Sequence, residues 1–388
     1  MVQLRRVVHR AIDALVWAAC VWLAPHVGGL IVWDTQSDQA PPPPAYVEVT
    51  IVAVGDVISH QDVQRAALEA ENGWASLWEE VTPLFEAADF AMANLETPVA
   101  PNTGKPGIPF CFNAPVELPR AIKETGVGLV FTANNHAFDQ NIAGVAETLG
   151  HLSDSGLLAV GSGMDRDAAL RPAIVNLRGM EVAVLSRTDL FNNCLNQRHD
   201  RPWVAELDIE RDAAIVQELR PQVDAVIVAV HWGNEYHAKP SQRQREAAAK
   251  LVEAGADAIV GHHPHVLQPF EWVEAGGRRG AVAFSLGNFL SNQDRMYVHE
   301  TQPIGSGDSR DGGLMVMTFR KDAEGARLLD ARVEPVWTDN NWIAHGRGIE
   351  KKRVIRVLTT APGNRGDEME ALLAKRRARA EAALAAML

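Results

Sequence analysis

The stretch Asp257–Val266 constrains the fold most, because an apolar strand runs directly into a cluster of imidazoles. Three apolar residues lead to Gly261, and His262, His263 and His265 follow within four positions. In α/β folds such a strand delivers polar side chains to the carboxyl edge of a sheet, where ligands bind. One proline stiffens the segment, and imidazoles two residues apart on an extended backbone point to the same face. We therefore predict a metal or catalytic site here rather than a His-rich surface loop.

Other apolar or β-branched runs end in polar residues in the same way. They lie at 46–54, 89–95, 128–133, 224–230 and 281–289. Helical patterns occupy 61–70, 77–88, 140–152 and 242–254. This alternation predicts an α/β fold with mixed, mostly parallel sheets flanked by helices, in which the carboxyl ends of the strands meet at one edge.

The remaining segments are predicted from local patterns. Residues 173–177 and 182–186 are expected to pair as strands, and 313–319 and 331–337 to pair antiparallel at a sheet edge. Loops are expected over 101–115, as a lid, and over 291–312, as a mobile segment. A last helix over 367–388 is predicted to start at an Asp367 N-cap. Its basic residues are expected to form a solvated face: Lys375, Arg376, Arg377 and Arg379.

The polar strand ends supply carboxylate, amide and imidazole groups, which suit two divalent ions such as Mn, Fe or Zn. The candidate ligands are Asp56, His60, Glu96, Asn135, His231, His263 and His265. Glu96 is expected to bridge the ions. Asp56 and His265 are assigned to one ion, and Asn135, His231 and His263 to the other, although His263 and His265 could share one ion. His262 is given a supporting role.

Catalytic roles fall to three further side chains. His136 is expected to act as general acid on the leaving group. Asp139 either orients that imidazole or caps the helix that follows. Glu235 serves as a base or as a salt-bridge partner of an arginine. The residues expected to contact substrate are Asn94, Asn134, Ser285 and Asn288.

Composition excludes several classes of protein. The formal net charge of -12 argues against nucleic-acid binding. The three cysteines include no CxxC pair, so a zinc-thiolate or redox site is unsupported. Cys111 and Cys194 either pair in an oxidising compartment or remain free thiols.

The first 33 residues have the character of a secretory signal or membrane anchor, with basic residues before an apolar run. Residues 34–45 contain four consecutive prolines and predict an extended tether. We expect a folded domain over 46–340, a C-terminal helical extension over 341–388, and a location that is exported or membrane-anchored, outside the cytoplasm.

Six motifs in order carry a resemblance to a known family. They are Gly55-Asp56, Asn94-Leu-Glu96-Thr-Pro98, Ala133-Asn-Asn-His136, His231-Trp-Gly-x-Glu235-Tyr236, Gly261-His-His-Pro-His265-Val-Leu-Gln268 and Ser285-Leu-Gly-Asn-Phe289. Together they resemble the bacterial capsule synthesis protein CapA, or poly-γ-glutamate PgsA, family. The resemblance implies a metallophosphoesterase-like, four-layer α-β-β-α sandwich. It also implies a role in making, anchoring or exporting an anionic exopolymer.

Two classes of function follow from these observations. One is a metal-dependent hydrolase or transferase that acts on a phosphoester or on an amide bond of the polymer; a general metallophosphoesterase is a variant of it. The other is a non-catalytic accessory subunit that binds the polymer. The expected partners are an anionic polymer or its precursor and membrane synthase or export subunits, with no nucleic acid.

Overall fold

The computed structural model describes residues 46–192, 196 and 200–385. The chain divides after Pro44 into two compact units, and the described residues belong to the second. The predicted leader and the tether lie outside the described residues. None of the described helices is long and apolar enough to cross a membrane.

The larger sheet contains strands from both halves of the chain. Its members are β1 (Val47–Val57), β2 (Phe90–Leu95), β3 (Val127–Phe131), β4 (Leu158–Val160), β13 (Asn288–Leu290), β14 (Asp311–Asp322), β15 (Gly325–Asn340) and β16 (Ile355–Thr359). Their order is β16-β15-β14-β1-β2-β3-β4, with β13 also paired to β1. β1 runs parallel to β2 and β13, whereas β14, β15 and β16 are antiparallel to their neighbours.

The second sheet lies across the core from the first. Its members are β6 (Ala173–Leu177), β7 (Met180–Thr188), β9 (Ala225–His231), β10 (Ala258–His262), β11 (Phe270–Ala275) and β12 (Arg278–Ala283), in the order β11-β12-β10-β9-β7-β6. β7, β9, β10 and β12 are parallel, as the alternating pattern predicted. A separate small ribbon pairs β5 (Ser162–Gly163) with β8 (Trp203–Val204).

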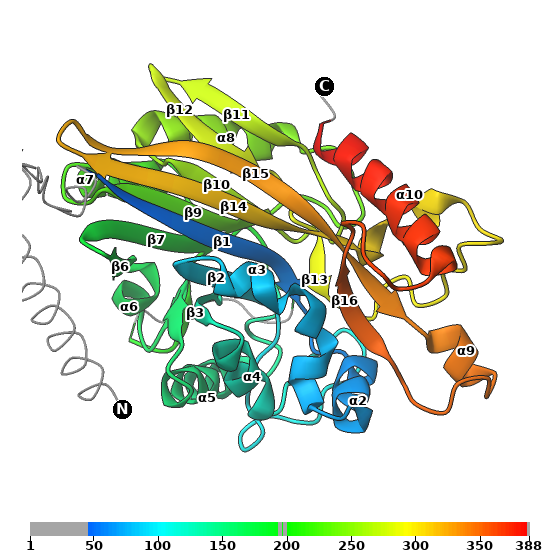
Figure 1. Ribbon diagram of the computed structural model, residues 1–388. Coiled ribbons are helices and arrows are strands. Elements are labelled where there is room, and N and C mark those ends of the chain that lie inside the picture. The colour runs from blue at the N-terminus through cyan, green and yellow to red at the C-terminus, as the bar shows by residue number, and fades with distance from the viewer. Residues whose placement is uncertain (1–45, 193–195, 197–199, 386–388) are drawn as a thin grey trace, which may run out of the picture. The chain divides into compact units, whose positions relative to one another are not determined.

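Helices cover the outer faces of both sheets. The α-helices are α2 (Gln61–Glu69), α3 (Thr82–Glu86), α4 (Glu117–Glu124), α5 (Asn141–Asp154), α6 (Arg166–Leu170), α7 (Ile209–Leu219), α8 (Gln242–Ala254), α9 (Trp342–Gly346) and α10 (Asp367–Leu384). Short 3-10 helices are η1 (Gly73–Leu77), η2 (Glu79–Val81) and η3 (Ile304–Arg310). Figure 1 shows α2, α3 and α4 on the side of β1–β3, and α8 near β10 and β12.

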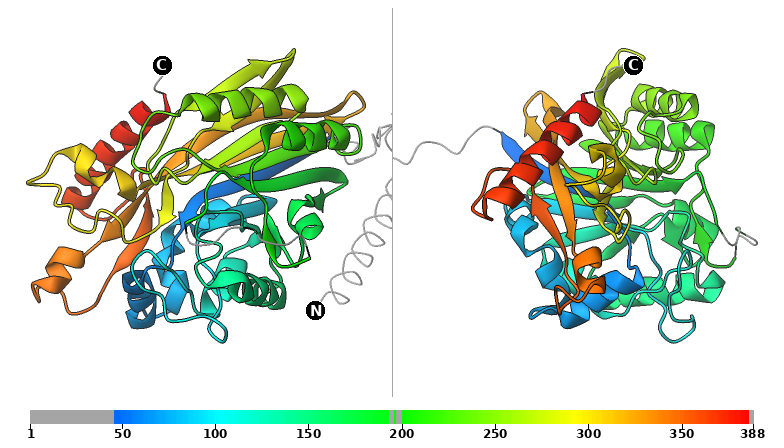
Figure 2. Two further views of the ribbon diagram at one scale, coloured as in Figure 1. Left: turned by 180° about the vertical axis from the view of Figure 1, so that it is seen from behind. Right: turned by 90° about the vertical axis from the view of Figure 1, so that its right-hand side faces the viewer.

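Successive side chains of a strand face opposite sides of its sheet, and this alternation creates the layers. In β1, Val52 and Val54 pack toward the helices, whereas Ile51 and Ala53 face the second sheet. In β9, Ile227 faces the first sheet and the neighbouring valines face α8. One apolar core therefore lies between the sheets and one lies under each helical layer. This confirms the predicted four-layer α-β-β-α sandwich, seen end-on in the right view of Figure 2.

Several predicted elements are confirmed and two are wrong. α8 has its predicted bounds because Ser241 and Gln244 form a capping box at its start. The helix predicted over 77–88 is instead broken into η2 and α3, with Pro83 in the first turn of α3. The N-cap of α10 is Gly366, so Asp367 is its first helical residue rather than its cap.

The C-terminal residues contribute to the main sheet. β16 pairs with β15, so β15 is an inner strand rather than the predicted sheet edge. The loop over 291–312 contains η3, and its last residues are buried. These contacts integrate residues after 340 into the same compact unit.

The basic face predicted for α10 is not uniformly solvated. The side chain of Arg376 is fully buried and pairs with Asp311 and Asp308. Its guanidinium also lies 4.5 Å from the ring centroid of Trp337. By contrast, Arg377 forms an exposed pair with Glu381 one turn away. The prediction was wrong for Arg376 because residues remote in sequence cover that side of the helix.

Replacing Arg376 should therefore destabilise the protein far more than replacing its neighbour. Arg376→Ala leaves the Asp311 carboxylate buried without its guanidinium, which costs about 3–5 kcal/mol. Arg377→Ala removes one exposed pair, worth about 0.3–0.5 kcal/mol. Urea denaturation of the two variants measures the difference, and equal free energies of unfolding would contradict the structural role of Arg376.

Candidate metal centre

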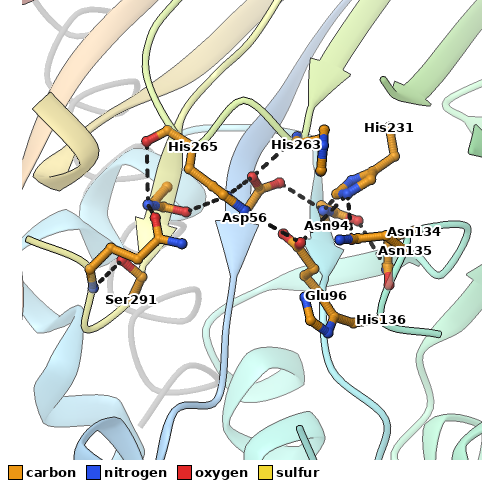
Figure 3. Close-up of polar contacts among 12 residues, drawn as sticks. Asp56, Asn94, Glu96, Asn134, Asn135, His136, His231, His263, His265 and Ser291 are labelled. Carbon is orange, nitrogen blue, oxygen red and sulfur yellow. Dashed lines mark hydrogen bonds and ion pairs between the residues drawn. The ribbon is translucent and has the colours of Figure 1, made fainter. Parts of the chain in front are cut away.

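The candidate centre forms where parallel strands of both sheets end at one edge. Asp56 near the end of β1 pairs in register with Asn94 of β2 and with Asn288 of β13. In the other sheet, His231 ends β9 beside His262 of β10. Figure 3 shows side chains from the two sheets directed toward one another. Tertiary packing of the sheets therefore assembles what the sequence distributes over more than 200 positions.

The backbone of the His-His-Pro-His loop differs from the prediction. His263 and His265 have φ values of 95° and 57°, in the left-handed region rather than the predicted extended one. Such conformations cost about 1–3 kcal/mol each and occur at functional sites. A Cβ on Gly261 would lie 2.0 Å from the carbonyl oxygen of Phe284. Both imidazoles reach the centre through a strained turn, and the glycine permits the close approach before it.

Two groups of potential metal ligands share one carboxylate. Glu96 groups with His263 and His265, and it also groups with Asp56 and His231. Within each group the ligand atoms lie within 4.8 Å of one another. Glu96 Oε1 lies 3.5 Å from His231 Nε2 and 3.8 Å from His265 Nε2. Glu96 thus has the position expected of a bridging ligand. His263 and His265 group together, which is the alternative left open on sequence, and His231 groups with Asp56.

The Glu96 carboxylate lacks the hydrogen bonds that a buried charge needs. The residue is 0% exposed, and within the described part of the chain neither of its oxygens has a hydrogen-bond partner. Among the same described residues, Nδ1 of His263 and Nδ2 of Asn135 are likewise buried without a partner. Buried polar atoms are normally paired. Divalent cations would satisfy the carboxylate and imidazole atoms, and the absence of thiolates suits Mn, Fe or Zn in a catalytic setting.

The two central carboxyl groups are held in different protonation states. Burial, followed by the charges of Asp56, Glu235 and Asp139, raises the pKa of Glu96 well above its usual value. Burial also acts to raise the pKa of Asp56, but a hydrogen bond and charge from His265 outweigh it and leave that pKa lowered. The two shifts are opposite, so Glu96 holds its proton to a higher pH than Asp56 does.

The imidazoles are held neutral. Burial and the neighbouring histidines lower the pKa of His231 well below its usual value. Burial and His265 lower the pKa of His263 to about 3. Neutral imidazole is the form that binds metal. These shifts therefore prepare both side chains as ligands near neutral pH.

Hydrogen bonds orient the ligand side chains. His265 Nδ1 lies 3.1 Å from both Asp56 Oδ2 and Asn288 Oδ1, so it carries the proton and leaves Nε2 free toward Glu96. Asn94 Nδ2 donates to Asp56 Oδ1 over 2.7 Å. Asn135 Oδ1 lies 2.8 Å from His231 Nε2, which places Asn135 at the centre as predicted from the sequence.

The predicted acid, His136, lies beside the centre and is bound at both nitrogens. Its Nδ1 lies 2.7 Å from Asp139 Oδ2, and its Nε2 lies 3.3 Å from Asn192 Nδ2. Asp139 also accepts the backbone N–H of Phe112 over 2.6 Å. The N-cap of α5 is Gln140, without a side-chain cap. Of the two roles considered for Asp139, the geometry supports orientation of the imidazole.

The other sequence-predicted residues have varied positions. Among the described residues His60 belongs to neither ligand group; it accepts the N–H of Asn292 at Nδ1 over 3.2 Å, and burial lowers its pKa to about 3. His262 lies 3.2 Å from the carbonyl oxygen of Val54, consistent with support. Ser285 is buried and accepts the N–H of Gly287.

The amides expected to contact substrate are internal braces. Asn134 Nδ2 donates to the carbonyl of Leu95, and its Oδ1, within the described residues, has no partner. Asn288 Nδ2 donates to the carbonyl of Ser309 over 2.8 Å. Among the described residues Cys111 forms no disulfide, and its candidate partner Cys194 lies outside them.

A pocket of about 420 Å³ opens beside the centre. His136, His265 and Glu235 line one end of it. The predicted lid, 101–115, supplies an apolar wall that includes Ile108, Phe110 and Phe112. Sequence reasoning did not identify five further lining residues, which are Asn292, Gln293, Asp294, Arg295 and Trp342. The first four lie in the loop after β13 and Trp342 lies after β15, and only the tertiary structure brings the two segments together.

An α-β-β-α sandwich with carboxylates and imidazoles at its shared edge defines a metallophosphoesterase-like protein. The chain belongs to the bacterial capsule synthesis protein PGA_cap family, whose model matches residues 50–293. This confirms the resemblance identified from the motifs.

Relatives and solved structures are similar over most of the chain. The PGA biosynthesis protein CapA of Bacillus subtilis (strain 168) is 30% identical over 316 residues, 79% of this chain and 76% of that protein. The capsule biosynthesis protein CapA of Bacillus anthracis is 29% identical, over 80% of this chain and 73% of its own. The calcineurin-like phosphoesterase YfkN of Bacillus subtilis is 11% identical, with a TM-score of 0.43 over 75% of this chain and 90% of its own.

Glu96→Gln should stabilise the metal-free protein and abolish its response to metal. The raised pKa means that the carboxyl group keeps its proton while the unfolded chain ionises, so stability is lost as pH rises above the unfolded value. An amide removes that penalty. In the wild type, an ion at a hundred times its dissociation constant adds about 2.7 kcal/mol.

Thermal unfolding with and without Mn²⁺ tests both effects, with Glu218→Gln, an exposed carboxylate on α7, as the matched control. A metal-induced shift of equal size in the wild type and Glu96→Gln would show that this carboxylate is not a ligand.

Metal binding should release protons. Since His231 and His263 are already neutral, the raised pKa of Glu96 makes it the ligand that must lose a proton. Roughly one proton per protein should be released in mildly acidic buffer, and apparent affinity should rise with pH until Glu96 ionises unaided. Calorimetry in buffers of different ionisation enthalpy measures the release. An affinity that does not change between about pH 5 and 7 would contradict this coupling.

Proposed function

We propose that this protein is a metal-dependent hydrolase or transferase of anionic exopolymer synthesis, with poly-γ-glutamate or a capsule polymer as its context. Family membership supports the context, since the relatives are named for PGA and capsule biosynthesis. A probable polyglutamine synthesis accessory protein of Mycobacterium tuberculosis is also 27% identical over 74% of this chain. Polymer or capsule synthesis is common to these descriptions, and the last of them describes an accessory protein.

The observation that carries the catalytic proposal is the buried Glu96 carboxylate. It lies between two imidazole-containing groups, and within the described residues neither of its oxygens accepts a hydrogen bond. A purely structural acid in this position would leave buried polar atoms without hydrogen bonds, which costs several kcal/mol. Packing alone does not explain a buried carboxyl group at position 96, whereas cation binding does.

The proposed ligands are the side chains that the geometry brings together. They are Asp56, Glu96, Asn135, His231, His263 and His265. Divalent ions held by them would act as Lewis acids that polarise a phosphoryl or carbonyl group of the substrate. His60 is not retained in this set, because the structure directs its Nδ1 to the backbone of Asn292.

His136 is the proposed general acid. The Asp139 carboxylate fixes the proton on Nδ1 and would stabilise an imidazolium, and the His136 side chain lines the pocket. Phe112 packs 4.3 Å from the His136 ring, between centroids, and limits access of water on that side. During bond cleavage Nε2 would donate its proton to the departing oxygen or nitrogen. Glu235, which also lines the pocket, is proposed to receive a proton from the attacking group.

Location and partners follow from the same context. We place the folded domain outside the cytoplasm, with residues 1–33 as its signal or anchor and 34–45 as the tether. Its substrate would be an anionic polymer or precursor, and its protein partners would be membrane synthase or export subunits. The domain limits of 46–340 and 341–388 are retained as functional divisions, although β16 joins them physically.

His136→Ala should lower kcat by about 10²–10⁴ because general-acid catalysis is lost. The protein is loaded with Mn²⁺, its metal content is measured, and turnover is followed with p-nitrophenyl phosphate and with a γ-glutamyl anilide. The two substrates separate phosphoester from amide chemistry. His151→Ala is the matched control, because His151 contacts Glu147 on α5 away from the centre.

If the purified protein holds no stoichiometric metal and His136→Ala cells make as much polymer as the wild type, the enzyme hypothesis is wrong. The protein would then be the non-catalytic accessory subunit. Metal binding with turnover of p-nitrophenyl phosphate alone would assign a general metallophosphoesterase.

A further inference from the structure

The lining of the pocket includes an arginine that the catalytic proposal does not use. Arg295 is exposed and lines the pocket that His136 and His265 border. Among the described residues it forms no ion pair and no side-chain hydrogen bond, although most arginines of the domain do. It is also the only lysine or arginine among the described pocket-lining residues. A cation without a partner beside a catalytic centre is available to a ligand.

The arginine lies over a fixed aromatic platform. Its guanidinium carbon lies 5.0 Å from the ring centroid of Trp342. Arg353 approaches the same ring at 5.6 Å, and its guanidinium is anchored by Asn292 and Asn340 over 2.8 Å each. Stacking on an aromatic face leaves the edge donors of a guanidinium free for a bidentate contact. Arg295 is therefore oriented without being neutralised.

The neighbouring carboxylates are already engaged with other groups. Asp62 accepts a hydrogen bond from Asn292 Nδ2, and Asp294 accepts the backbone N–H of Ser309, each over 2.8 Å. These acids and Glu235 make the pocket lining more negative than positive. A singly charged anion is thus repelled less than a phosphate dianion. Carboxylate also matches a guanidinium in geometry.

The apolar residues of the lid indicate that the ligand also has an aliphatic part. Phe110, although 83% exposed, lines the pocket with Ile108 and Tyr236. Apolar side chains such as these pack against the methylene groups of a ligand, while its polar groups bind elsewhere. A ligand that suits the whole pocket has a reactive group at the ion ligands, a short aliphatic stretch, and a carboxylate at Arg295.

We propose that Arg295, presented on Trp342, binds a carboxylate of the substrate and so selects carboxylate-bearing chains for the neighbouring centre. This inference rests on the proposed function and specifies its substrate class. The region matched by the family model ends at residue 293. The carboxylate site therefore lies in a part of the chain that the family match does not describe.

The test measures binding, so it does not depend on turnover. The Mn²⁺-loaded full chain is titrated by calorimetry with a γ-linked glutamate trimer and with the same trimer carrying α-amides in place of α-carboxylates. Arg295→Ala should weaken binding of the acid trimer about tenfold or more, the effect of losing a charge-assisted hydrogen bond. Binding of the amide trimer should be weak in the wild type and unchanged in the variant.

Arg279→Ala provides a matched control. Arg279 is also exposed and lies 4.2 Å from the centroid of Trp272, but it is on β12 and does not line the pocket. This variant should bind both trimers as the wild type does. Arg295→Lys should restore part of the affinity, because the charge returns without the planar fork.

Equal affinity of the wild type for the two trimers, or an unchanged affinity in Arg295→Ala, would overturn the proposal. A parallel titration with inorganic phosphate provides the other arm. If Arg295→Ala weakens phosphate but not the acid trimer, Arg295 binds phosphate and the carboxylate assignment is wrong. Failure of catalysis in the His136 assay would leave these binding results intact, so the two proposals fail separately.

Discussion

The burial of two carboxyl groups at one sheet edge is the constraint on which the rest of the centre depends. Asp56 and Glu96 are both 0% exposed, and Asp56 adds its charge to the burial that raises the pKa of Glu96. Hydrogen bonds from Asn94 and His265 compensate Asp56. Glu96 has no such compensation within the described residues. The fold thus supplies hydrogen bonds to Asp56 and leaves Glu96 to bind a cation.

The surrounding structure is built to sustain that imbalance. The left-handed backbone conformations of His263 and His265 are strained, and the packing of the sheets on either side offsets the cost. Burial lowers the pKa of His231 and of His263, so these two imidazoles do not pair with Glu96 as cations. The site therefore resembles a preorganised receptor, in which ligands are fixed before an ion arrives.

Much of this arrangement could be predicted from strand ends. The parallel strands, the helix α8 and the convergence of Glu96 with Asp56 and His231 follow from periodicity and motif order. The environment of Arg376 could not be predicted, because its helix carries the composition of a solvated surface. The contact of Arg295 with Trp342 was also missed, since it joins segments 47 positions apart.

The sequence by itself determined the alternation of strands and helices and the chemical type of the ligands, because these depend on local periodicity and on residue identity. Its motifs also carried the family resemblance, which implied the four layers. Only the tertiary structure decided which histidines share Glu96, that Asp139 serves His136 rather than a helix end, and how the pocket is walled. Those outcomes depend on distances between chain segments and on exclusion of water. Both arise when the two sheets pack, and neither is encoded at any single position.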